Sequence, residues 1–62
     1  MKASPSLVQA ASELLIEYKL NANRIQRKHL RGLEDTSFRE FKRGHISYEE
    51  LKRDFDAALG RK

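Results

Sequence analysis

A chain of 62 residues has room for one domain, and folding at this size buries only about 60% of the unfolded chain's surface. The absence of cysteine excludes disulfide bonds and thiolate metal sites, and His29 and His45 lack a recognised metal-ligand spacing. The formal net charge is +4, and no apolar segment has the length of a membrane span or the form of a signal peptide. We expect one cytoplasmic domain over residues 1–62, with no metal, cofactor or membrane anchor.

The first predicted helix covers residues 5–31. Ser4 and Ser6 are candidate N-caps, Pro5 suits the first helical position, and Gly32 is a plausible stop. Apolar residues follow the three-and-four spacing of one helix face. They are Leu7, Val8, Ala11, Leu14, Leu15, Tyr18, Ala22 and Ile25.

The length of this helix poses a problem for a monomer. It would measure about 40 Å, whereas a compact domain of this size is about 27 Å across. Asn21 and Asn23 are the weakest helix formers in its middle, so the helix either breaks there or extends beyond its own domain. We slightly favour a continuous helix whose excess length is covered by a second chain in a dimer.

Two more helices are predicted after it. Ser37 and Glu40 fit a capping box and Gly44 a stop, while Ser47 caps a last helix that ends at Gly60. The predicted fold is all-α: a small three-helix domain with a long first helix, a short second helix and a capped C-terminal helix. Its expected core comprises Val8, Ala11, Leu15, Tyr18, Ala22, Ile25, Leu33, Phe38, Phe41, Ile46, Leu51, Phe55 and Leu59.

The turn before the last helix has two family-like patterns. An EF-hand loop would place Arg39, Phe41 and Arg43 at ligand positions, and none of them binds calcium. The segment 44–51 also resembles the SHOCT module, whose Gly-x-Ile-[Ser/Thr]-x-Glu-Glu core is matched by Gly44, Ile46, Ser47, Glu49 and Glu50, followed by Leu51. That resemblance implies an oligomerisation or adaptor role.

The whole excess of positive charge lies in Arg24, Arg27, Lys28 and Arg31, because the basic and acidic residues before and after this segment balance. Their spacing places them on one helix face. Such a face binds nucleic-acid phosphates, steers an acidic protein partner, or is simply solvated near a helix C-terminus. A helix-turn-helix around Gly44 is disfavoured because the last helix is acidic.

Catalysis has little support in the sequence. Ser37 and Ser47 are explained as helix caps, no glycine-rich phosphate loop is present, and a domain this small has little room for a water-excluding pocket. We therefore expect no enzymatic activity and no small-molecule substrate.

The favoured function is that of a small regulatory or adaptor protein, of bacterial or phage type, that binds a protein partner or itself through an amphipathic helix surface. Apolar positions in excess of the core, at Leu7, Leu14, Ile16 and Leu20, motivate it. The candidate partner-binding residues are Leu7, Leu14, Tyr18 and Tyr48. Two alternatives stay open: nucleic-acid binding through Arg24, Arg27, Lys28 and Arg31, and a structural subunit of an assembly.

Overall fold

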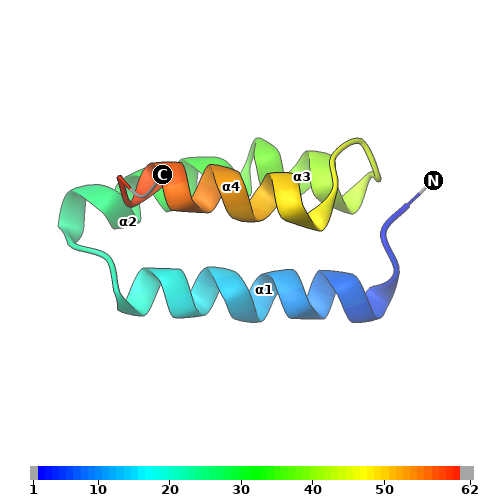
Figure 1. The fold of residues 1–62 in the computed structure, drawn as a ribbon, viewed down its shortest axis with the longest axis horizontal. Helices are drawn as coiled ribbons and strands as arrows, with labels where there is room; N and C mark the ends of the chain where they lie inside the picture. Colours follow the sequence, from blue (N-terminus) through cyan, green and yellow to red (C-terminus); the bar gives the residue numbers. More distant parts are fainter. Residues whose placement is uncertain (1, 61–62) are drawn as a thin grey trace.

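Residues 2–60, which this computed structural model describes, contain four helices and no strand (Figure 1). They are α1 (Pro5–Leu20), α2 (Arg24–Glu34), α3 (Ser37–Lys42) and α4 (Tyr48–Ala58). Only Asp35 and Thr36 separate α2 from α3, and these two helices together run alongside α4. α1 lies roughly parallel to α4 and packs against both α2 and α4. The arrangement is therefore one of three helical rods, and the predicted all-α, three-helix class is confirmed.

The helix expected over residues 5–31 is divided at Asn21–Asn23. The Asn21 N–H closes the end of α1 by donating to the Glu17 carbonyl at 3.3 Å. The Asn23 side chain accepts from the Gln26 N–H at 2.8 Å, and the Gln26 side chain accepts from the Asn23 N–H at 2.9 Å. This reciprocal capping box starts a new helix, so the preference for a continuous helix is wrong.

The break also resolves the length problem. The described residues have a radius of gyration of 10.9 Å and extents of 33 × 20 × 16 Å, so one copy accommodates every helix. α2 continues past Gly32 and ends at Glu34. The prediction that Gly32 ends the helix is therefore wrong.

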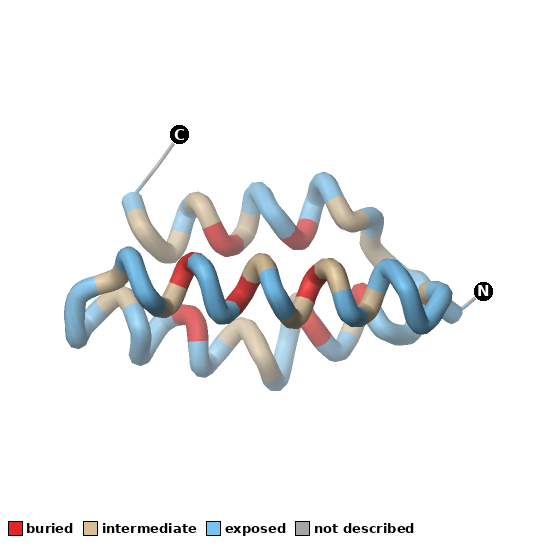
Figure 2. The backbone as a smooth tube through the Cα atoms, turned by 90° about the horizontal axis from the view of Figure 1, so that it is seen from below, coloured by how far each residue is buried: buried red, intermediate tan, exposed pale blue. Residues whose placement is uncertain are grey.

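The core lies where the three rods meet. It consists of Ala11, Leu15, Tyr18, Leu30, Phe38, Phe41, Leu51 and Phe55. Figure 2 shows these positions as buried segments on the inner sides of the helices. Phe55, Leu30 and Leu51 are its largest fully buried side chains, and the rings of Tyr18 and Phe55 are 5.7 Å apart.

One predicted core residue is wrong. Ile25 continues the apolar spacing of α1 in the sequence, but its side chain is 68% exposed. The break at Asn21–Asn23 interrupts the helical phase, so α2 turns a different set of residues inward. Leu30, with no exposed surface, is the residue of α2 that enters the core.

Polar contacts join the rods around this core. The Tyr18 hydroxyl donates to the Asp56 carboxylate at 2.5 Å, linking α1 to α4. Lys19 forms an ion pair with Glu34 between α1 and α2. The Gln26 side-chain amide donates to the Leu59 carbonyl at 3.2 Å. Each contact spans two rods, so together they set how the rods are oriented.

The start of α3 differs from the prediction. Ser37 does not cap it: Thr36 occupies the N-cap position without a side-chain hydrogen bond, and Ser37 is the first helical residue. The Ser37 hydroxyl instead donates to the Asp54 carboxylate of α4 at 2.6 Å. A tertiary partner has replaced the local cap, and this contact holds α3 against α4.

The turn between α3 and α4 follows the predicted chemistry. Gly44 has a φ of 81°, a left-handed conformation that glycine adopts without steric cost. The His45 N–H donates to the Glu40 carbonyl at 2.9 Å and the Gly44 N–H to that of Phe41 at 3.0 Å, which is a Schellman motif. The Ser47 hydroxyl then caps α4 by accepting from the Glu50 N–H at 3.1 Å.

A pH-dependent contact closes the same turn. The His45 ring Nδ1 lies 2.5 Å from the Glu40 carboxylate. The pKa of Glu40 lies below its ordinary value, first because of this hydrogen bond and then because His45, Arg43 and Arg39 favour the charged form. A carboxylate with a lowered folded-state pKa stabilises the fold above its unfolded pKa, and that stabilisation is lost as pH falls through the folded value.

Replacing Glu40 by glutamine therefore reduces the acid sensitivity of the fold. Between about pH 5 and pH 3 the wild type is expected to lose more stability than the Glu40→Gln variant, because only the wild type loses this carboxylate's contribution. Urea unfolding followed by circular dichroism at several pH values measures the difference. Parallel pH profiles for the two proteins would contradict this account of the turn.

Candidate binding surface

A groove runs along the outside of the molecule between α2 and α4. It has a volume of about 930 Å³. Ile25, Lys28, His29, Gly32 and Leu33 line it from α2, and Asp54, Ala57 and Ala58 from α4, with Thr36 and Ser37 at the junction with α3. We call this set the groove. Most of its lining is apolar, and it lies on the side of both helices away from α1.

The sequence of α2 explains why this surface exists. At about 100° per residue, α2 presents three different faces. One face turns inward with Leu30 at its centre, and the next contributes Ile25, His29 and Gly32 to the groove. The third bears only cations, which we call the basic arc: Arg24, Arg27, Lys28 and Arg31. The groove and the basic arc meet at Lys28.

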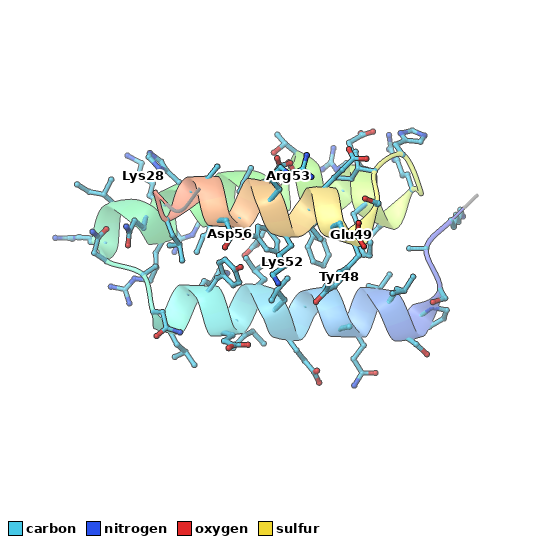
Figure 3. All side chains as sticks on the ribbon, in the orientation of Figure 1. Lys28, Tyr48, Glu49, Lys52, Arg53 and Asp56 are labelled. Atoms are coloured by element: carbon cyan, nitrogen blue, oxygen red, sulfur yellow. The ribbon has the colours of Figure 1, made fainter. Side chains whose placement is uncertain are left out.

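The four side chains of the basic arc are all exposed, and none forms an ion pair within residues 2–60. Figure 3 shows Lys28 projecting from α2 on the side away from α1. The nearby Lys19, by contrast, is paired with Glu34. The basic arc is therefore a cluster of positive charge without ion pairs in residues 2–60, and it lies beside the groove. The spacing in the sequence predicted only that its four residues share one helix face.

Gly32 is the unusual residue of the groove. It lies inside α2, and a Cβ added there would meet no heavy atom within 4 Å. Glycine in a helix interior costs about 1 kcal/mol relative to alanine, and no neighbour among residues 2–60 requires it here. Like Ala57 and Ala58 of α4, it lines the groove without contributing a bulky side chain.

Replacing Gly32 by alanine is expected to stabilise the domain by about 0.5–1 kcal/mol. The new methyl group enters open space and the helix loses a residue of poor propensity. The urea midpoint of Gly32→Ala compared with the wild type tests this. A lower midpoint would show that the space above Gly32 is needed by the fold itself.

The predicted partner-binding residues do not form one exposed surface. Leu7 is 46% exposed near the start of α1, whereas Leu14 is half-buried and packs against the core. Tyr48 is half-buried at the start of α4, with its ring 6.2 Å from that of Phe41. Tyr18 is only 6% exposed, so its assignment to a partner-facing surface is corrected: it is a core residue hydrogen-bonded to Asp56.

The groove residues Ile25, Gly32 and Ala57 were not among the predicted site residues. One signal was present: a glycine inside a helical pattern marks either a helix end or a close approach. It was interpreted as a helix end. Ala57 gave no signal, because its exposure depends on how α4 packs beside α2.

Other kinds of site find little support in the part of the chain that the structure describes. No group of three or more His, Cys, Asp or Glu side chains there is arranged to hold a metal ion. The Ser37 and Ser47 hydroxyls are both engaged in structural hydrogen bonds. Within residues 2–60, no helix combines the length and apolar character needed to cross a bilayer.

Comparison with family models, curated proteins and solved structures gave no significant match. The resemblance of residues 44–51 to the SHOCT module rests on the local pattern alone, which here forms the Schellman turn and the Ser47 cap. The groove and the basic arc are therefore the features of the molecule that bear on its function.

Proposed function

We propose that this protein is a small, non-catalytic regulatory or adaptor module that binds a protein partner in the groove between α2 and α4. The observation behind the proposal is Gly32. A glycine within α2 weakens this helix, and a Cβ added there would meet no heavy atom within 4 Å in the described residues 2–60, so it leaves open space beside the groove. Such a position suits the close approach of a second backbone.

The chemistry of the groove describes its partner. An amphipathic helix laid in a groove inserts apolar side chains at helical spacing. Here those side chains would contact Ile25, Leu33 and Ala57, while acidic residues flanking them would meet the basic arc. The expected partner segment is therefore apolar along one side and acidic along its edge. Charge of opposite sign speeds the encounter and excludes basic partners.

A second candidate function is nucleic-acid binding. The observation that favours it is that all four cations of the basic arc are exposed on one face of α2. Side chains in this arrangement neutralise phosphates without reading base sequence. This candidate leaves the exposed Ile25 and the open space at Gly32 without a role, so it ranks second.

The test of the proposed function is affinity capture from a lysate of the source organism, with and without nuclease. Wild type is compared with Gly32→Trp, which fills the groove, and with Lys52→Trp, which adds the same bulk at an exposed position of α4 outside the groove. Circular dichroism first establishes that all three proteins fold.

We expect a protein that is captured by wild type and Lys52→Trp, resists nuclease treatment and is absent with Gly32→Trp. Capture that disappears with nuclease would favour the nucleic-acid candidate. Equal capture by Gly32→Trp and Lys52→Trp would overturn the assignment of the groove.

A further inference from the structure

The outer side of α1 is an exposed surface that the proposed function does not use. Ile16 is 58% exposed and Leu20 81% exposed. Glu13 and Glu17 are exposed on the same side and form no ion pair within residues 2–60. We call Glu13, Ile16, Glu17 and Leu20 the α1 strip. Figure 2, which views the molecule from the side of α1, shows exposed positions along the length of this helix.

The α1 strip has the chemistry that the groove requires of a partner. Its residues recur at three- and four-residue intervals, so two apolar and two acidic side chains lie on one side of a helix. From Glu13 to Leu20 it rises about 11 Å, while the groove residues of α2 from Ile25 to Leu33 span about 12 Å. The α1 strip therefore fits within the length of the groove.

Charge selects how two copies can meet. If two grooves faced each other, the two basic arcs would lie close together. If two α1 strips faced each other, their glutamates would lie close together. Like charges placed together disfavour both arrangements. Only the α1 strip of one copy against the groove of another pairs acidic with basic side chains and apolar with apolar ones.

We propose that the occupant of the groove is the α1 strip of a second copy of this chain. The groove lies between α2 and α4, and α1 packs on the opposite side of those two helices, so the two surfaces point away from each other. A contact between different surfaces on opposite sides does not close into a symmetric dimer, and it repeats head to tail. The inference rests on the proposed function, because both use the groove.

The strength of the contact is expected to be modest. A single helix in one groove is smaller than specific, stable interfaces, which bury about 1,200–2,000 Å². Association is therefore expected at concentrations between about 10 µM and 1 mM. A foreign partner with more contacts would displace the second copy, which would make self-association a competitor of partner binding.

The test is sedimentation equilibrium with charge-inverted variants of the full chain. One variant, Glu13→Arg with Glu17→Arg, makes the α1 strip basic. The other, Arg24→Glu with Lys28→Glu, removes the net positive charge of the basic arc beside the groove. A control, Arg39→Glu with Lys52→Glu, changes two exposed cations outside both surfaces and has the same formal net charge as the second variant.

We expect wild type and the control to increase in average mass with concentration, beyond that of a dimer. Each variant alone should associate at least about tenfold more weakly, because in the first both surfaces are basic and in the second the arc has lost its net charge. An equimolar mixture of the two variants should recover association, because the acidic α1 strip of the second variant can then meet the basic arc of the first.

Three results would overturn the inference: a wild type that stays monomeric up to about 1 mM, a mass that stops at the dimer, or a mixture that does not recover association. These results are distinguishable from failure of the proposed function. Suppose that the wild type stays monomeric, and that it captures a foreign partner which Gly32→Trp does not capture. The second copy is then excluded as the occupant, but the groove is still a binding site.

Discussion

Replacing Phe55 by alanine should unfold most of the protein at 25 °C. Phe55 has no exposed surface, and its ring packs against Tyr18 where α1 meets α4. Truncating a buried phenylalanine to alanine costs about 3–5 kcal/mol. In a domain this short a single core rarely supplies more than about 3–5 kcal/mol of net stability, so the loss removes most or all of it. Urea unfolding followed by far-ultraviolet circular dichroism measures the change.

The matched control is Phe55→Leu, which keeps an apolar side chain of more similar volume and should cost about 1–1.5 kcal/mol. It should therefore unfold cooperatively at a lower urea concentration than the wild type. A Phe55→Ala protein with the wild-type midpoint would mean that Phe55 is not central to the core. That result would contradict the packing of α1 against α4 described above.

Changing all four residues of the basic arc to glutamate should abolish detectable partner binding. The change removes four cations beside the groove and replaces them with charges that repel an acidic partner. At about 0.5–1 kcal/mol for each exposed charge, the loss is about 2–4 kcal/mol, or roughly 30- to 1,000-fold in affinity. The fold should survive, because all four side chains are exposed and form no ion pair within residues 2–60.

The salt dependence of wild-type binding then separates the two candidate functions. If the four cations neutralise four phosphates, affinity for DNA or RNA falls about 100-fold between 50 mM and 200 mM salt. A protein partner held largely by apolar contact in the groove is expected to show a much shallower dependence. Binding that is unchanged in the four-glutamate variant would exclude the basic arc from either function.

Much of the fold was predictable because local chemistry determines it. The Ser4 and Ser47 caps, the Gly44 turn and the periodic apolar residues of α1 and α4 all follow from short sequence patterns. Each of these features depends on residues within one or two helical turns. These short sequence patterns were therefore sufficient to predict an all-helical fold and most of its core.

The break at Asn21–Asn23 was harder to predict. The poor helix propensity of two asparagines costs a continuous helix roughly 1 kcal/mol. Tertiary packing can easily outweigh a difference of this size, so propensity alone does not decide whether the helix breaks. A stronger signal was the Asn23–Gln26 pair, which forms the capping box of α2. If this capping box is not recognised, the apolar spacing of α1 is continued into α2. That continuation wrongly predicts Ile25 as the core residue, whereas Leu30 is the one that is buried.

The binding surface could be predicted only in part. The basic arc follows from sequence spacing alone, since four residues at three- and four-residue intervals share a face of any helix. The groove does not, because it depends on how α2 and α4 pack side by side. Tyr18 was assigned to the surface because a phenol tolerates water, but its hydrogen bond to Asp56 satisfies the hydroxyl inside the protein.

Site-specific photo-cross-linking tests the central assignment of the groove most directly. A photoreactive amino acid is placed at His29, which is exposed and lines the groove, and in a separate protein at Lys52, which is exposed outside it. Both proteins are irradiated in a lysate of the source organism. We predict a discrete adduct with a foreign protein from position 29 that excess wild type suppresses and excess Gly32→Trp does not, and no such adduct from position 52. The same adduct from both positions, or an adduct from position 52 alone, would contradict the assignment of the groove as the binding surface.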